Sequence, residues 1–60
     1  MIRYIAVPKN KNKEPIFFSS AKEVREFFRL SLNKFDTFLE EGVPVFLGDG
    51  AYFLDEDLNQ

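Results

Sequence analysis

The side chains that could act in catalysis are few. The 60-residue chain contains no cysteine and no histidine, which excludes thiolate nucleophiles, thiolate zinc sites and imidazole bases. A nucleophile also needs a base and a group that orients the base. The remaining candidates are serines, tyrosines and scattered carboxylates: Ser19, Ser20, Ser31, Tyr4 and Tyr52 among them. Each of these residues has a structural explanation, so we predict no enzymatic activity and no cofactor.

The acidic residues do not have the spacing of a metal site. Glu40 and Glu41 are adjacent, so on a helix their side chains point apart and are expected to be solvated. The later acids lack the alternating spacing and the closing glutamate of a calcium loop. They are Asp49, Asp55, Glu56 and Asp57. We therefore predict no metal.

Three lysines alternate with asparagines between residues 8 and 14, at Lys9, Lys11 and Lys13. The simpler interpretation is a solvated loop whose charges discourage strand pairing with other chains. The alternative is a loop that contacts phosphates, since Lys and Asn commonly bind the DNA backbone. The segment separates the runs 2–7 and 15–18, which are rich in β-branched and aromatic residues and predict a hairpin.

Two short helices are predicted in the centre of the chain, from Ser20 to Leu30 and from Ser31 to Gly42. Ser20 and Glu23 have the spacing of a capping box, and Ser31 is a second good N-cap. Gly42 is suited to a left-handed C-cap. Apolar residues recur at helical spacing in both: Val24, Phe27 and Phe28, then Phe35, Phe38 and Leu39. Because the link between the two helices is so short, we expect the helices to cross at a steep angle, as in a helix-turn-helix.

A second hairpin is predicted after the helices. Asp49-Gly50 is a strong turn signal between Val43–Leu47 and Ala51–Leu54. With these two residues at the centre of the turn, three cross-strand pairs are expected: Leu47 with Tyr52, Phe46 with Phe53 and Val45 with Leu54.

The pattern as a whole predicts one α+β domain spanning residues 1–60. Its small helix-turn-helix core of two short helices is flanked by two β-hairpins in the order β-β-α-α-β-β. Residues 55–60 are expected to be a frayed tail.

Composition and charge limit the partners. Residues 1–25 carry six basic and two acidic residues, whereas residues 26–60 carry two and eight. Eight phenylalanines are many for this length, so a Phe-rich surface covered by a protein partner or a homodimer is expected. No apolar run approaches the ~20 residues that span a bilayer, and the first residues lack the apolar region of a signal peptide. We expect a cytoplasmic protein with no membrane partner.

The centre of the chain resembles the nuclease-associated modular DNA-binding domains of phage and intron-encoded homing endonucleases. Four stretches carry the resemblance: residues 18–24 as the Ser-capped entry, 28–31 as the turn, 35–42 as the second helix, and 50–53 as the closing strand. The resemblance implies a helix-turn-helix that presents its second helix to a DNA groove. Arg29 stands where the family often has glycine, and Asp36 and Glu40 stand where it tends to small polar and basic residues.

Two hypotheses follow. In the first, a small phage or mobile-element protein binds double-stranded DNA, with base contacts from Asn33, Lys34 and Thr37. Phosphate contacts then come from the basic residues of the amino-terminal half and the turn: Lys9, Lys11, Lys13, Lys22, Arg25 and Arg29. In the second, a protein-protein interaction regulator of helix-turn-helix descent uses an acidic, Phe-rich surface, and its carboxylates imitate DNA phosphates.

Overall fold

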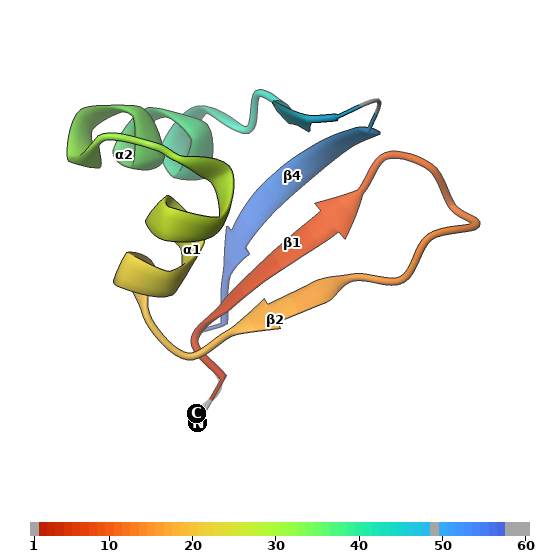
Figure 1. Ribbon diagram of the computed structural model, residues 1–60, viewed down its shortest axis with the longest axis horizontal. Helices are drawn as coiled ribbons and strands as arrows, with labels where there is room; N and C mark the ends of the chain where they lie inside the picture. The colour runs from red at the N-terminus through yellow and green to blue at the C-terminus, as the bar shows by residue number, and fades with distance from the viewer. Residues whose placement is uncertain (1, 49, 58–60) are drawn as a thin grey trace.

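The computed structural model describes residues 2–48 and 50–57 and contains two helices and four strands (Figure 1). Their order, β-β-α-α-β-β, confirms the predicted small α+β fold. The elements are β1 (Tyr4–Pro8), β2 (Ile16–Phe18), α1 (Ala21–Phe28), α2 (Leu32–Glu41), β3 (Val45–Leu47) and β4 (Gly50–Glu56).

The strands form one antiparallel sheet in the order β2-β1-β4-β3. The sequence pattern predicted the two hairpins but not the pairing of β1 with β4 that unites them in one sheet. In this pairing Ala6 lies opposite Leu54 and Tyr4 lies opposite Glu56. β4 therefore continues through Asp55 and Glu56, where a frayed tail had been expected. The rest of that expected tail, residues 58–60, lies outside the described residues.

The predicted register of the second hairpin is wrong by two residues. Leu47 pairs with Gly50, Phe46 with Ala51 and Val45 with Tyr52. Gly50 thus belongs to β4, and Gly48 is the glycine in the connection, with φ of 63°. Asp49, predicted as a turn residue, lies outside the described residues. A shift of two residues leaves each side chain on the face that the alternation assigned to it.

Both predicted N-caps are present. The Ser20 hydroxyl accepts a hydrogen bond from the backbone N–H of Glu23 at 3.3 Å, and the Ser31 hydroxyl accepts one from that of Lys34 at 3.2 Å. The Glu23 carboxylate accepts from the N–H of Ser19 at 2.7 Å, one residue earlier than a standard capping box. Gly42 ends α2 with φ of 70°, as predicted.

Both helices cover the same face of the sheet. Alternate strand residues point toward them, because successive side chains in a strand point to opposite faces. All six elements contribute buried residues to a single cluster: Ala6, Phe18, Val24, Phe28, Phe35, Val45 and Leu54. Contacts between aromatic rings join the layers, with Phe28 5.5 Å from Tyr52 and 6.2 Å from Phe18 between ring centroids. No helix within residues 2–48 and 50–57 covers the other face of the sheet (Figure 1).

Candidate nucleic-acid interface

The link between α1 and α2 has the compactness of a helix-turn-helix. Only Arg29, Leu30 and Ser31 separate the eight-residue α1 from the ten-residue α2. Arg29 is left-handed, with φ of 57° and ψ of 53°, so this position does adopt the conformation for which glycine is preferred. The backbone N–H of Leu30 donates to the carbonyl of Arg25 at 2.8 Å, the six-to-one hydrogen bond of a Schellman motif. The turn is therefore fixed by its own backbone.

The three predicted base-contacting residues lie together within residues 33–37 of α2. Asn33, Lys34 and Thr37 are exposed, and with Phe38 they line a shallow hollow of about 340 Å³. The Thr37 hydroxyl donates to the backbone carbonyl of Asn33 at 3.0 Å, which leaves its oxygen lone pairs as acceptors. The side chains of Asn33 and Lys34 can supply hydrogen-bond donors to a ligand on this surface.

The basic residues of α1 and the turn form a second group. Lys22 and Arg25 line a hollow with Glu26 and Leu30. Arg25 is partly buried, and its Nε donates to the Leu30 carbonyl at 3.3 Å, so this guanidinium also holds the turn. Lys22 and Arg29 are exposed and are the members of this group best placed to meet an anion.

The other exposed polar side chains of α2 are acidic. Asp36, Glu40 and Glu41 are all exposed, and no basic residue lies in the last turn. Carboxylates at a helix C-terminus add to the negative end of the helix dipole. The surface around Asn33 and Lys34 is therefore the part of α2 that is electrostatically suited to approach a phosphate backbone.

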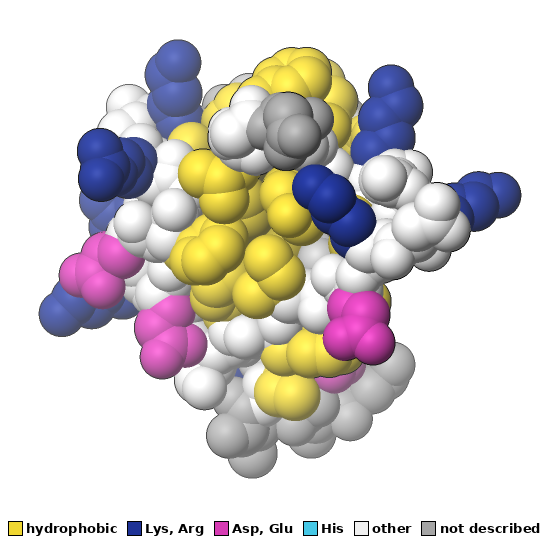
Figure 2. All heavy atoms as spheres, turned by 45° about the vertical axis from the view of Figure 1, so that its right-hand side comes forward, with side chains coloured by type: hydrophobic (Ala, Val, Ile, Leu, Met, Phe, Trp, Pro, Cys, Tyr) yellow, Lys and Arg dark blue, Asp and Glu magenta, His cyan; other side chains and the backbone are white. Residues whose placement is uncertain are grey.

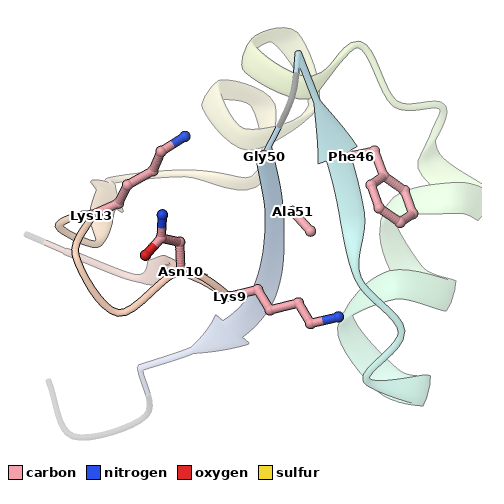
Figure 3. Close-up of a pocket in the computed structure, with 6 residues that line it drawn as sticks. All are labelled: Lys9, Asn10, Lys13, Phe46, Gly50 and Ala51. Carbon is pink, nitrogen blue, oxygen red and sulfur yellow. The ribbon is translucent and has the colours of Figure 1, made fainter.

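The lysines of the loop between β1 and β2, which were predicted to contact phosphates, lie far from α2. In Figure 1 this loop and the helices stand at opposite ends of the longest axis of the molecule, whose extent is 27 Å. Lys9 and Lys13 instead line a hollow of about 380 Å³ with Asn10, Phe46, Gly50 and Ala51 (Figure 3). Lys11 is exposed in the same loop. The nine predicted contact residues thus do not form one continuous surface.

Exposed apolar side chains mark a surface that the sequence did not locate. Phe46 is 76% exposed, Phe17 53% and Val7 43%. Figure 2 shows hydrophobic side chains gathered in a band down the middle of the face in view. The abundance of phenylalanine predicted a Phe-rich surface, but not that these residues lie on the sheet.

Four of the five candidate catalytic side chains named above have structural roles. Ser20 and Ser31 cap the helices. The Tyr4 ring packs on Phe35, and the Tyr52 ring packs on Phe28. Among residues 2–48 and 50–57, no group of three acidic side chains is placed to hold a metal ion. Within the same residues, neither helix has the length and apolar character needed to cross a membrane.

Comparison of the chain with models of known protein families, with curated proteins and with solved structures found no match to any of them.

Proposed function

We propose that this chain is a small, non-enzymatic, cytoplasmic protein that binds double-stranded DNA through α1 and α2. The observation that carries the proposal is the pair of helices joined by a three-residue turn, with Asn33, Lys34 and Thr37 exposed together on α2. In a helix-turn-helix, the first half of the second helix is the part that reaches base edges in the major groove. The resemblance to modular DNA-binding domains supports the same assignment.

The chemistry of these side chains suits base edges. Asn33 can pair with adenine through both its amide oxygen and its amide nitrogen, and Lys34 can donate to guanine O6 and N7. Thr37 can accept a hydrogen bond or contact a thymine methyl group. Lys22 and Arg29 then serve as phosphate contacts beside the groove. The lysines of the first loop are not part of this proposed contact surface, because they lie at the other end of the molecule.

The test is a titration of mixed-sequence duplex DNA by fluorescence anisotropy, between about 20 and 200 mM salt. Binding is expected at low salt and should weaken steeply as salt rises, because bound phosphates release counterions. Lys22→Ala, which removes a proposed phosphate contact, should weaken binding and lower the salt dependence by about one counterion. Lys11→Ala is the matched control, since it removes the same charge from the distant loop and should leave binding unchanged.

Asn33→Ala separates recognition from stability. The side chain is exposed, so the free energy of unfolding should change by less than about 0.5 kcal/mol. Affinity for a preferred sequence should fall while affinity for mixed-sequence DNA is retained, because base contacts carry specificity and phosphate contacts carry most of the non-specific affinity. Absence of DNA binding by the unaltered chain at the lowest salt would refute the proposal.

Protein binding is the second candidate function. It is favoured by the exposed carboxylates of α2, Asp36, Glu40 and Glu41, together with the uncovered Phe46 and Phe17. In this alternative the protein is a regulator whose acidic helix imitates DNA phosphates toward a DNA-binding partner. Competition distinguishes the two functions, since a mimic would displace DNA from its partner without binding DNA itself.

A further inference from the structure

The side of the sheet that faces away from the helices is apolar in its centre. Strand alternation and the register place Ile5 and Val7 of β1 on this side, beside Phe53 of β4. Phe17 lies opposite Ile5, and Phe46 lies opposite Ala51. We call this surface the outer sheet face; it comprises Arg3, Ile5, Val7, Lys9, Phe17, Phe46, Ala51, Phe53, Asp55 and Asp57.

Exposure of this kind is unusual for a solvated sheet. An antiparallel sheet with one face packed on helices normally turns polar side chains to water on the other. Here Val7, Phe17 and Phe46 are 43%, 53% and 76% exposed. Contiguous exposed apolar surface commonly marks an interaction site.

The two ends of the outer sheet face carry opposite charge. Lys9 follows β1, and its N–H donates to the Ala51 carbonyl at 2.8 Å; residues 9–14 hold three lysines and one glutamate, a net charge of +2. At the other end, the N–H of Asp57 donates to the Arg3 carbonyl at 2.8 Å. On the outer sheet face, Arg3, Asp55 and Asp57 together carry a net charge of −1, because alternation turns Glu56 to the other face with Tyr4. The face is thus basic at one end of β1, apolar in the middle and acidic at the other end.

We propose that the outer sheet face binds a second copy of this chain, sheet against sheet, in a symmetric dimer. The two-fold axis lies midway between the two sheets, parallel to their planes and perpendicular to the strands. Rotation about this axis reverses the strand direction of one copy relative to the other. It therefore brings the basic end of each copy over the acidic end of the other and the Val7–Phe53 pairs together in the centre. Each copy presents the same surface to the other, as a closed dimer requires.

The charge pattern favours a second copy over a nucleic acid at this face. A phosphate backbone crossing the sheet would meet the carboxylates of Asp55 and Asp57, whereas a second copy places them near Lys9. The sheet is only four strands wide, or about 15 Å between its outer strands at ~4.8 Å spacing. A surface of this width is smaller than the ~800 Å² per partner of a standard interface, so a weak dimer is expected.

The first experiment measures molar mass by sedimentation equilibrium between about 5 µM and 1 mM, the range over which such a dimer forms. The mean mass should rise from one chain to two. Val7→Lys puts a charge in the centre of the face and should weaken association at least tenfold. Leu32→Lys is the control, because Leu32 is 55% exposed but lies on α2, and it should leave association unchanged. Circular dichroism verifies that both variants are folded.

The second experiment tests the orientation of the two copies. Lys9→Glu and Asp55→Lys should each weaken self-association, since each places like charges near one another across the dimer. An equimolar mixture of the two variants should associate more tightly than either alone, because both ends of the mixed dimer then have opposite charges. No gain in the mixture would overturn the proposed orientation. The dimer would be overturned by a chain that stays monomeric at 1 mM. It would also be overturned if the chain did not self-associate but bound single-stranded nucleic acid, and Val7→Lys abolished that binding.

The dimer and the DNA proposal can fail separately. Pairing through the outer sheet face leaves α1 and α2 on the two outer sides of the dimer, so DNA binding does not require the face that association covers. Val7→Lys should keep DNA binding, and Lys22→Ala should keep association.

Discussion

The ring of Tyr4 in β1 meets the ring of Phe35 in α2 edge to face, with centroids 5.4 Å apart and an interplanar angle of 75°. This contact joins the first strand to the second helix across 31 positions of sequence. Phe35 is only 3% exposed, so its ring is enclosed between the helix and the sheet. The orientation of α2 on the sheet, and with it the placement of Asn33 and Lys34, depends on this packing.

Phe35→Ala should therefore unfold much of the protein. Truncating a buried phenylalanine costs about 3–5 kcal/mol, as much as the core of so small a domain generally supplies. Leu32→Ala in the same helix is the control, since Leu32 is 55% exposed and should lose less than about 1 kcal/mol. Urea unfolding followed by circular dichroism measures both. Equal losses would show that α2 packs with a different face toward the sheet.

Arg29→Gly should stabilise the protein. A non-glycine residue in the left-handed region costs about 1–2 kcal/mol, and Arg29 is the one such residue in the described chain, with φ of 57°. Part of the gain is lost because glycine also loosens the unfolded chain, so a net increase of about 0.5–1 kcal/mol is expected.

Glu26→Gly provides the contrast for Arg29→Gly. Glu26 is exposed within α1, where glycine should cost about 1 kcal/mol relative to a good helix former. Thermal unfolding should place the melting temperatures of the two variants on opposite sides of that of the unaltered protein. A loss in both would mean that the Arg29 side chain contributes more than its backbone strain costs.

Ser31→Ala should remove about 1 kcal/mol of stability, because the backbone N–H of Lys34 then loses the hydroxyl that accepts its hydrogen bond. Ser19→Ala is the matched control, since Ser19 uses its backbone N–H rather than its hydroxyl to bind Glu23. Denaturant midpoints of the two variants report the difference. A Ser19→Ala loss as large as that of Ser31→Ala would contradict the assigned cap.

The parts of the fold that sequence predicted are those determined by neighbouring residues. Ser20, Ser31 and Gly42 act within one helical turn of their own positions, so their roles are visible in a short window. The pairing of Ala6 with Leu54 joins distant segments and leaves no local pattern. The candidate site divides in the same way: Asn33, Lys34 and Thr37 share a helix, whereas the distance of the loop lysines from them follows from the long-range packing of the sheet.

The error in the second hairpin has a more specific cause. Residues 48–50 read Gly-Asp-Gly, so a two-residue turn could use either the first pair or the second. The two registers differ by two positions and bury the same faces, and alternation of apolar residues therefore could not distinguish them.

Glycine substitutions test which register the hairpin adopts. Gly48 has φ of 63°, so Gly48→Ala should cost about 1–2 kcal/mol from left-handed strain. In Gly50→Ala the added Cβ would approach Lys13 Nζ at 3.1 Å. That atom ends a flexible side chain that can move, so the loss should stay below about 0.5 kcal/mol. Urea midpoints of the two variants give the comparison. If Asp49 and Gly50 formed the turn instead, Gly50→Ala would be the costlier change, because both central residues of that turn require positive φ.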